Sequence, residues 1–523
     1  MGSSKRIASG FIWTTLQTII NGVYGFVSVP LLLAHFGKAN YALIGLAMSI
    51  NVYLGMMDLG FNNTSVRYFA NWCAKKNFDL VKKLFSTNLI FYGSLGFVNS
   101  LVLLVVSCFS QQIFDVSAEQ DIVLKHLFYI LSISAFIGWY TSVFNQILQG
   151  NEYVGWVQRF VFIPKCVQIL VLVLTLTSNF SIELYYGLTV FSAFLTMPIV
   201  IWKIKKVCPY ISFKPSFDKA IFKEMLPYSL QVFSFGFFQF SANYLRPVIL
   251  GIRGNIESVA DFRIVNGIVG IVIMLGGMFI GIIMPSASKV VAMNNLEAQD
   301  RIAYQGTKFL SIFLCLVSFG MMSISRDLLL AYVGPAYLHL LVWLNLWLIM
   351  TAVGSHIQCM SSLILSGTKI SGVTIPTITA AVVTIVACWI LTPFFQVGGA
   401  IIAYSLFSLI LVGYYYLYYY QKKMHKDSWR LFSKSFLPSF LLGFALSLIC
   451  INLPIDLGKW GTLICKGLIF AVAYLSLSYL YLNNYVFDVS DTGVRHNSRA
   501  MGAERRPVQA GIGYAGAGVW HQP

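Results

Sequence analysis

Residues 11–69 read FIWTTLQTIINGVYGFVSVPLLLAHFGKANYALIGLAMSINVYLGMMDLGFNNTSVRYF, and this stretch decides the fold of the chain. It contains two long apolar segments joined by the short turn HFGKAN at 35–40. Each segment exceeds the roughly 20 apolar residues that an α-helix needs to cross a hydrocarbon core of about 30 Å. The second segment carries Asp58, Gly60 and Arg67, and charged side chains at this depth usually face a polar interior or the interface. We therefore interpret the stretch as a membrane hairpin that lines a polar cavity, which the rest of the chain repeats and encloses.

The composition excludes a soluble globular protein. Of the 523 residues, 57% are hydrophobic and 11% are charged, whereas soluble domains are usually about a quarter charged. The formal net charge is +17, but no basic run exceeds two consecutive residues. The lysines and arginines gather in alternate loops, which is typical of the positive-inside rule in membrane proteins. We therefore expect a polytopic membrane protein with no nucleic-acid partner.

The cysteines and the N-terminal segment exclude two further classes of protein. The nine cysteines form no CxxC and no Cys/His ligand spacing, so we expect no disulfide framework, no metal site and no cofactor. Lys5 and Arg6 precede a long segment that contains Gln17 and Asn21 and no small-residue cleavage site. This pattern predicts an uncleaved first membrane span, not a signal peptide.

Apolar segments predict an all-α fold with fourteen transmembrane helices. An even number places both termini on one side of the membrane. The expected bounds are 10–34, 41–66, 84–109, 124–148, 154–178, 184–204, 225–250, 259–284, 306–325, 337–364, 373–393, 398–420, 433–452 and 462–482.

The distribution of basic residues predicts that both termini are cytoplasmic. With that orientation, inner loops and helix ends hold 23 lysines and arginines, and the outer turns hold 7. A bias of this size is a strong orientation signal. The tyrosine-rich run at 414–420, just before Lys422 and Lys423, fits an aromatic belt at the inner interface.

An internal repeat with an offset of 217 residues divides the chain. The matched pairs are Pro30 and Pro247, Leu33 and Leu250, Gly37 and Gly254, Gly60 and Gly277, Leu148 and Leu365, Gly150 and Gly367, and Gly155 and Gly372. A six-helix unit repeated in parallel predicts two lobes in a pseudo-twofold arrangement around a central cavity. The predicted parts are a first lobe (1–204), a cytoplasmic linker (205–224), a second lobe (225–420) and two extra helices (421–484). A polar tail (485–523) is expected to be disordered, and no function is assigned to it.

Two basic residues lie deep in predicted helices and are candidate binding residues. Arg246 lies late in the seventh helix, and a guanidinium there needs a carboxylate, an anionic ligand or water. Its fork geometry suits a phosphate or pyrophosphate; the alternative is snorkelling to the outer interface. Lys165 lies in the middle of the fifth helix and shares a face with Gln168. It is a candidate wall of a polar cavity, with a structural ion pair as the alternative.

For the other charged residues and for two prolines, the sequence allows two roles each. Arg67 and Arg263 are either substrate contacts or anchors at the inner and outer interfaces. Asp58 is a candidate proton carrier or charge partner, and a helix-capping role is equally open. Pro30 and Pro247 occupy equivalent positions in the repeat and are candidate hinges or simply tolerated membrane prolines.

The sequence contains no catalytic motif, so no catalytic residue is proposed and a transporter is favoured over an enzyme. There is no GxxxxGK[ST], GxSxG, HExxH or paired-histidine spacing. The predicted outer loops are short, whereas a membrane polymerase is expected to carry a large one. The first outer turn lacks the acidic residues expected of a glycosyltransferase that uses a lipid-linked donor.

Several stretches together resemble the Wzx-type O-antigen flippases, which are polysaccharide transporters of the multidrug/oligosaccharidyl-lipid/polysaccharide exporter superfamily. They are Phe36-Gly37, residues 41–46 (YALIGL), residues 58–61 (DLGF), Arg67, and residues 284–289 (MPSASK), which are similar to the exit of helix eight in that group. The resemblance covers roughly residues 5–480. It rests on the arrangement of short, permissive motifs.

The resemblance implies two six-helix lobes plus two helices in a bacterial inner membrane. The implied activity, within O-antigen and lipopolysaccharide biosynthesis, moves an undecaprenyl-pyrophosphate-linked oligosaccharide from the cytoplasmic to the periplasmic leaflet by alternating access. Arg246, Lys165, Arg67 and Arg263 are then the candidate cations for the pyrophosphate. The implied partners are this lipid-linked glycan, membrane lipids and other polysaccharide assembly proteins.

One departure keeps alternatives open. Many relatives have an acidic residue late in helix seven, where this chain has Arg246, so ion-coupling residues cannot be carried over. A cation-coupled multidrug-type antiporter should place carboxylates deep in its helices, but Asp58, Glu183 and Asp261 lie near predicted helix ends. A membrane polymerase or glycosyltransferase is the third alternative.

Overall fold

The computed structural model describes residues 3–293, 295–365 and 371–493. The chain divides into two compact units, Met1–Ala471 and Val472–Pro523. The first unit contains every feature discussed below, except for the end of the last helix.

The described residues are helical, with no strand among them. In chain order the elements are α1 (Ser3–Leu54), η1 (Gly55–Asp58), α2 (Phe61–Ala74), α3 (Phe78–Cys108), α4 (Ser110–Ile113), α5 (Ala118–Gly150), α6 (Val154–Phe160), α7 (Phe162–Ser178), α8 (Ile182–Phe191), η2 (Ser192–Thr196), α9 (Met197–Val207), α10 (Lys219–Arg253), α11 (Ile256–Ala292), α12 (Leu296–Arg301), η3 (Ile302–Gly306), α13 (Thr307–Ser323), α14 (Ser325–Tyr332), η4 (Pro335–Leu340), α15 (Leu341–Ser355), α16 (Gln358–Leu365), α17 (Ser371–Phe395), α18 (Val397–Gly413), η5 (Tyr414–Lys423), α19 (Ser428–Leu431), η6 (Phe432–Phe436), α20 (Leu437–Ile451) and α21 (Gly458–Gly493).

Twelve helical segments in the described part of the chain are long and apolar enough to cross a membrane. The protein is therefore a multi-pass α-helical membrane protein, as the sequence predicts. The count differs from fourteen for two reasons. The first hairpin is one continuous candidate, Leu16–Asp58, and α10 is absent from the set. Although α10 has 35 residues, polar residues such as Gln239 and Asn243 lower its apolar character.

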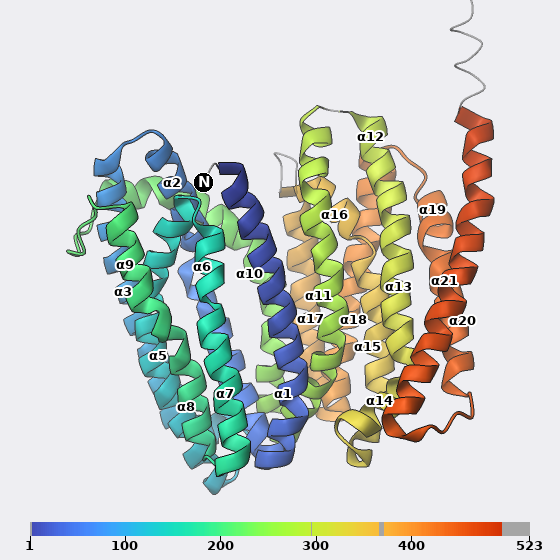
Figure 1. The fold of residues 1–523 in the computed structure, drawn as a ribbon, viewed down its shortest axis with the longest axis horizontal. Helices are drawn as coiled ribbons and strands as arrows, with labels where there is room; N and C mark the ends of the chain where they lie inside the picture. The colour runs from blue at the N-terminus through green and yellow to red at the C-terminus, as the bar shows by residue number, and fades with distance from the viewer. Residues whose placement is uncertain (1–2, 294, 366–370, 494–523) are drawn as a thin grey trace, which may run out of the picture. The chain divides into compact units, whose positions relative to one another are not determined.

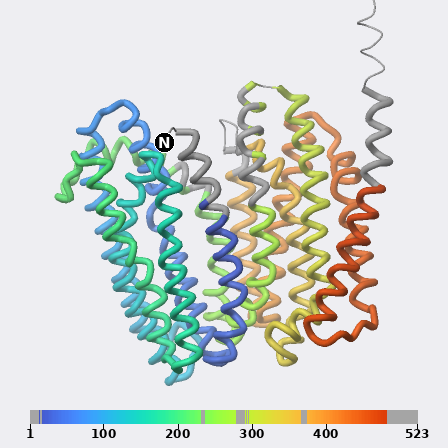
Figure 2. The backbone as a smooth tube through the Cα atoms, viewed as in Figure 1, coloured from blue at the N-terminus to red at the C-terminus, as the bar shows by residue number. Residues whose placement is uncertain are grey.

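The first hairpin turns where the sequence predicts a turn. Gly37 has φ 78° and ψ 165°, which are not helical, and it bends α1 between its two apolar arms. A positive φ is costly for any residue with a Cβ, so glycine suits this position. Figure 2 shows the two arms in blue, joined at the end of the molecule away from the N-terminus.

Several predicted helices are interrupted, among them those expected at 184–204, broken by the 3₁₀ segment η2, and at 337–364, broken between α15 and α16. The helix expected at 41–66 ends in the short 3₁₀ turn η1, after which Leu59 and Gly60 take positive φ values of 50° and 78°. The chain then restarts as α2. The helix expected at 154–178 is divided between α6 and α7 at Val161. Apolar length alone does not reveal such breaks, because the residues on both sides remain compatible with a membrane.

Helix starts lie earlier than hydropathy predicts because polar caps precede the apolar runs. A side-chain oxygen that accepts a hydrogen bond from a backbone N–H satisfies one of the unpaired donors of the first turn. Ser117 and Gln120 form a reciprocal capping box at the start of α5. Other helices begin with a single capping side chain: Asn77 for α3, Ser181 for α8, Asp218 for α10, Asn295 for α12 and Asp427 for α19.

The repeat is retained at its first turn and lost at the second. Gly254 follows α10 as Gly37 follows the first arm of α1, but its φ is −102°. A Cβ at Gly254 would instead meet the carbonyl oxygen of Leu250 at 2.8 Å. Gly60 is the N-cap residue just before α2, whereas Gly277 lies inside the continuous α11. Gly367 lies outside the described residues. The proposed ranges of the two lobes therefore stay a prediction.

The expectation of disorder from residue 485 is wrong at its start. Helix α21 continues through this point to Gly493. The remainder of that predicted tail, residues 494–523, lies outside the described residues.

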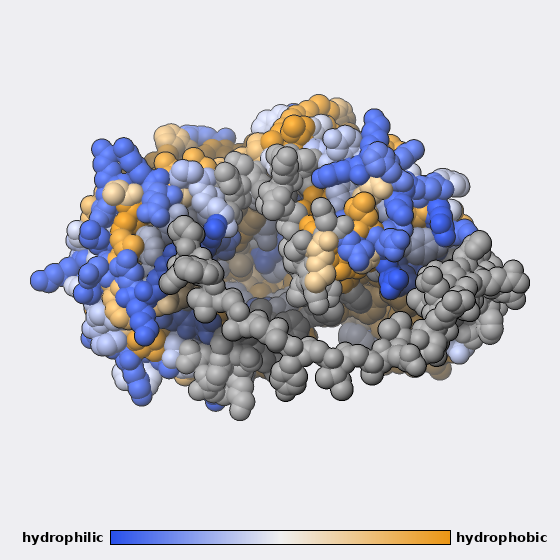
Figure 3. Space-filling view, turned by 90° about the horizontal axis from the view of Figure 1, so that it is seen from above, coloured by the Kyte–Doolittle hydropathy of each residue, from blue (hydrophilic) through white to orange (hydrophobic). Residues whose placement is uncertain are grey.

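The first six predicted spans and the following ones each pack among themselves, and α1 contacts both groups. Helix α3 packs along α5, α17 packs along α18, and α1 contacts α5, α6 and α7 as well as α10 and α11. Figure 1 shows these helices running side by side, with α2 and α12 at the same end as the N-terminus and α14 at the opposite end. Figure 3, viewed from the N-terminal end, shows many hydrophilic side chains on that face. Exposed lysines of the described chain include Lys75, Lys76, Lys205, Lys206 and Lys214.

At the opposite end, contacts join α1 to the later helices. Lys38, beside the turn of α1, pairs with Asp261 at 2.9 Å and with Glu257 at 3.3 Å, both on α11. The Tyr332 hydroxyl, at the end of α14, donates to the Phe26 carbonyl oxygen at 2.7 Å, and the two rings stack at 4.4 Å. These contacts hold the two groups of helices together at this end.

Candidate functional site

A cavity with a volume of about 720 Å³ lies between α1 and the helices that follow α9. Its wall is built from both groups of helices. The lining residues are Gly45, Met48, Ser49 and Val52 of α1, Gln239, Asn243, Tyr244, Arg246 and Pro247 of α10, Phe262, Arg263, Asn266, Gly270 and Ile273 of α11, and Met350, Thr351, Gly354, Ser355, Ile357, Gln358, Ser361, Thr377, Tyr404, Phe407, Ser408, Leu411 and Tyr415 of the later segments. We call this space the central cavity.

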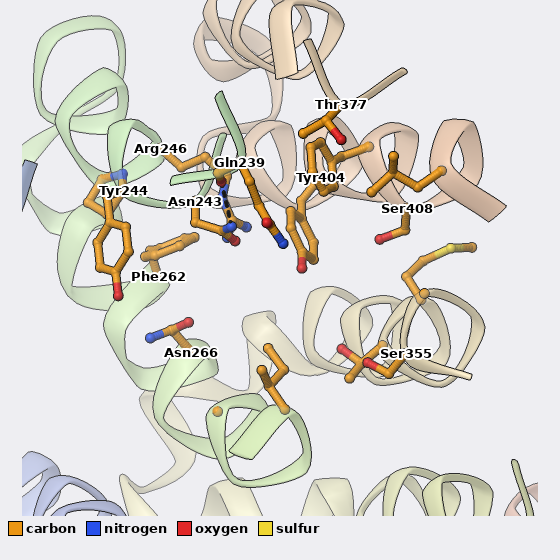
Figure 4. Close-up of a pocket in the computed structure, with 18 of the residues that line it drawn as sticks. Gln239, Asn243, Tyr244, Arg246, Phe262, Asn266, Ser355, Thr377, Tyr404 and Ser408 are labelled. Atoms are coloured by element: carbon orange, nitrogen blue, oxygen red, sulfur yellow. Dashed lines mark hydrogen bonds between the residues drawn. The ribbon is translucent and has the colours of Figure 1, made fainter. Parts of the chain in front are cut away.

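Arg246 is buried in the wall of the central cavity and is only 4% exposed. Its Nη2 donates to Asn243 Oδ1 at 3.3 Å, a contact drawn as a dashed line in Figure 4. Its Nε and Nη1 have no hydrogen-bond partner. Burial at this level does not fit snorkelling to the outer interface, which would leave the guanidinium in water.

Three aromatic rings surround the Arg246 guanidinium. Its Cζ lies 4.3 Å from the ring centre of Tyr404, 5.1 Å from that of Trp347 and 5.2 Å from that of Phe262. The negative faces of such rings attract a cation, by about 2 kcal/mol in desolvated settings. The rings hold the guanidinium in place without neutralising it.

The position of Arg246 follows from the spacing of polar residues along α10. Gln239, Asn243 and Arg246 are four and three residues apart, so they share one face of the helix. Asn243 Nδ2 donates to the Gln239 carbonyl oxygen at 2.8 Å, which orients Oδ1 toward Arg246. Figure 4 shows the three side chains pointing from α10 toward Tyr404.

Arg263 is the second cation of the central cavity. Its guanidinium lies over the Tyr41 ring, with Cζ 4.5 Å from the ring centre, and its Nη1 has no hydrogen-bond partner. The side chain crosses α1 at Gly45, where a Cβ would overlap Arg263 Cδ. A glycine is required here for this close approach. Tyr41 and Gly45 belong to the YALIGL stretch quoted from the sequence.

The remaining polar wall of the central cavity is uncharged. No acidic residue is among its described lining residues, and neither Arg246 nor Arg263 forms an ion pair with an acidic residue in the described part of the chain. Figure 4 shows Asn266, Ser355, Thr377 and Ser408 around the same space. The cavity therefore combines two positive charges with amide and hydroxyl groups.

Lys165 lies in a different cavity from Arg246, so the structure does not bring together all the predicted cations. In the described part of the chain, the second cavity is lined by residues between 17 and 200, and its volume is about 500 Å³. As predicted from their spacing, Lys165 and Gln168 share a face, and Lys165 Nζ donates to Gln168 Oε1 at 2.7 Å. Lys165 Nζ also lies 4.3 Å from the ring centre of Tyr24.

Arg67 and Asp58 do not line either cavity. Arg67 is exposed on α2, and its Cζ lies 4.2 Å from the Tyr228 ring centre. This position suits the interface anchor that the sequence left open. The Asp58 carboxylate accepts from Gly60 N at 2.9 Å and Asn62 N at 3.2 Å, which is the geometry of a cap at the start of α2.

The two prolines differ in position. Pro247 lines the central cavity next to Arg246, inside the continuous α10. Pro30 lies inside α1, whose departure from helical dihedral angles is at Gly37. Hinge motion at either proline stays a prediction.

A family model now places the chain. The model described as "Polysaccharide biosynthesis protein" matches residues 7–291, which is more than half of the chain. The chain belongs to this family. No curated protein sequence matches it.

Solved structures show which fold this family member has. It is similar to "Lipid II flippase MurJ, inward closed conformation" with a TM-score of 0.70 and 15% identity, covering 91% of this chain and 99% of that one. It is also similar to an inward-facing multidrug resistance MATE family transporter of the MOP superfamily, with a TM-score of 0.62 and 14% identity over 87% and 100% of the chains. The MATE multidrug transporter DinF-BH gives 0.55 and 16% over 81% and 97%. The chain has the fold of these transporters.

Sequence reasoning missed much of the polar wall of the central cavity. Gln239, Asn266, Ser355 and Tyr404 were not proposed, although the structure places them around one space with Arg246. Only Gln239 carried a usable signal, because it continues the helical face of Arg246. The others lie in different helices, whose rotation about their axes is fixed by packing.

Proposed function

We propose that the protein is a flippase that moves a polyprenyl-pyrophosphate-linked oligosaccharide, an O-antigen or similar surface-polysaccharide repeat unit, across the bacterial inner membrane. The family assignment supports a role in polysaccharide biosynthesis, and the fold is that of transporters. The direction is from the cytoplasmic to the periplasmic leaflet, with both termini in the cytoplasm.

One observation carries this proposal. The central cavity holds the guanidinium groups of Arg246 and Arg263, each with nitrogens that have no hydrogen-bond partner. No acidic residue lines this cavity in the described part of the chain. Keeping a buried ion unpaired costs several kcal/mol. An anionic group that accepts hydrogen bonds from Arg246 and Arg263 would offset that cost. Arginine presents a planar fork that matches phosphate oxygens, and a pyrophosphate has enough oxygens for two such forks.

The rest of the cavity suits a glycan. Sugars bind through hydroxyl groups that both donate and accept hydrogen bonds, and the side chains of Asn266, Ser355, Thr377 and Ser408 offer matching groups. Phe262 and Tyr404 provide flat apolar faces in the same space. The volume of about 720 Å³ falls within the range of ordinary ligand pockets.

The contacts at one end of the molecule support alternating access. Lys38, Asp261 and Tyr332 join α1 to the later helices at the end opposite the N-terminus. With cytoplasmic termini, this end is the periplasmic one. Release of the glycan there requires these contacts to separate, and the helices on either side then rock about the central cavity.

A cation-coupled multidrug antiporter of the same superfamily is less well supported. Coupling to protons or sodium ions needs a carboxylate that faces a cavity, and the described lining residues of both cavities include none. The same absence disfavours a polymerase or glycosyltransferase, which needs fixed acid, base or metal-binding groups.

The test uses a strain that lacks the gene and carries plasmid copies of the wild type, Arg246→Met, Arg263→Met or Arg253→Met. Arg253 is the matched control, because it lies on the same helix but is exposed and outside the central cavity. We expect the deletion to lose surface glycan and to accumulate lipid-linked repeat units facing the cytoplasm. Both cavity variants should restore less than the control at equal protein level.

Normal glycan display in the deletion strain would refute the flippase. Drug sensitivity in its place would support the antiporter. Loss of glycan in the deletion, together with full activity of both cavity variants, would keep the flippase and reject the pyrophosphate site.

A further inference from the structure

The second cavity lies inside the first group of helices and takes no part in the proposed pyrophosphate site. Its lining comes from α1, α5, α6, α7, α8, η2 and α9. Residues of α10 or any later helix are absent from its described lining. Its function therefore does not depend on how the central cavity binds a glycan.

Lys165 is the single charged residue among the described lining residues of the second cavity. An ammonium group carries three N–H donors, and the structure shows one hydrogen bond from Lys165, to Gln168 Oε1. Gln168 is held in place by its Nε2, which donates to Ser192 Oγ at 3.3 Å and to the Thr189 carbonyl oxygen at 3.4 Å. A neutral amide and the Tyr24 ring are thus the contacts of a half-buried positive charge.

Further hydrogen-bond donors line the same cavity as this charge. Gln17 and Asn21 of α1 and Ser134 and Asn145 of α5 line the same cavity. Within the described part of the chain, none of these side chains is engaged in a hydrogen bond. Amide and hydroxyl groups beside an ammonium are the elements of an anion site, because each can donate to a negative ion.

We propose that the second cavity binds a small monovalent inorganic anion, of which chloride is the commonest in cells. A lone ammonium is a compact point charge, which suits a spherical ion, whereas an oxyanion would be matched by the fork of an arginine. One negative charge also neutralises the one positive charge of the cavity. A cation is disfavoured, because the described lining offers no carboxylate.

The test measures chloride binding to the purified full-length protein in detergent. Thermal unfolding is followed while sodium chloride replaces sodium isethionate at constant ionic strength, so that screening by salt stays equal. A ligand that binds only the folded state raises the Tm in a saturable way. The line width of the ³⁵Cl NMR signal provides a second readout that does not depend on unfolding.

Two variants make the result specific. Lys165→Gln removes the charge and keeps a polar side chain, and we expect it to weaken chloride binding about tenfold or more by both readouts. Lys308→Gln is the matched control, because Lys308 is another half-buried lysine in a candidate span but lies outside both cavities. It should retain the wild-type response.

Three outcomes would overturn the proposal. The first is a wild-type protein whose Tm and ³⁵Cl line width do not respond to chloride. The second is an undiminished response in Lys165→Gln. The third is a Lys165-dependent response to sodium glucuronate but not to chloride, which would assign the cavity to an acidic sugar. None of these readouts requires transport, so failure here leaves the flippase proposal untouched.

Discussion

Replacing Arg246 with methionine removes a guanidinium whose Nε and Nη1 have no partner in the free protein. If these two nitrogens donate to pyrophosphate oxygens, each hydrogen bond to the charged group contributes about 1.5–3 kcal/mol. The lower values together give about 3 kcal/mol, or roughly a hundredfold weaker binding. The assay is the affinity of purified protein for undecaprenyl pyrophosphate, with undecaprenyl monophosphate as the matched ligand.

The same substitution should leave the stability of the free protein nearly unchanged. The structure gives Arg246 one hydrogen bond, of 3.3 Å, and three aromatic neighbours. Desolvation of its charge costs several kcal/mol and opposes these contacts. Methionine can fill a similar volume without that cost. We therefore expect a Tm equal to or above that of the wild type, which separates a binding residue from a structural one.

Two results would refute this reasoning. An affinity of Arg246→Met for the pyrophosphate within twofold of the wild type would show that Arg246 does not bind it. A large fall in Tm that accompanies the loss of affinity would assign Arg246 a structural role. Arg253→Met, on the same helix, controls for the loss of one positive charge and should change neither quantity.

Three further predictions concern other contacts. Gly45→Ala should lower the Tm and reduce glycan export, because the added Cβ would overlap the Arg263 side chain. Gly270→Ala should change neither quantity, because no atom lies within 4 Å of its added Cβ. Equal effects of the two substitutions would contradict the steric argument. Lys38→Met should lower the free energy of unfolding by about 1–2 kcal/mol in thermal or denaturant unfolding, because it removes the lysine that pairs with the buried Asp261 carboxylate at 2.9 Å. An unchanged unfolding transition would reject that contribution. Burial raises the pKa of the Cys73 thiol. At pH 7 its thiolate fraction and its alkylation rate should therefore lie below those of a free thiol, and both should rise with pH. Mass spectrometry of the alkylated protein measures this rate, and fast alkylation at neutral pH would contradict the prediction.

The fold was more predictable than the site. Apolar length and the distribution of basic loops are properties of the sequence. The turn at 35–40 was expected because it separates two long apolar segments, and the structure places a positive φ at Gly37 within it. The breaks at Leu59 and Val161 were missed, because they result from local backbone geometry and not from a change in hydropathy. The start of the predicted tail was wrong for a similar reason, since α21 extends to Gly493.

The candidate site was predictable only where a charge stood out against its surroundings. Arg246 and Lys165 lie inside long apolar segments, and each proves to line a cavity. That they line different cavities could not be predicted, because this depends on which helices pack together. Arg67, at the end of the second predicted helix, was expected to be either a substrate contact or an interface anchor, and it is exposed on α2.

The two positive charges of the central cavity have a consequence for the energetics of a transport cycle. A bound pyrophosphate would bring about two negative charges, so the loaded cavity would be close to neutral and would move with little effect of voltage. The empty cavity retains the charges of Arg246 and Arg263. One elementary charge that crosses a potential of 100 mV changes in energy by about 2.3 kcal/mol. In a cell with a negative interior, the membrane potential would therefore return the empty carrier to its cytoplasm-facing state, without a coupling cation.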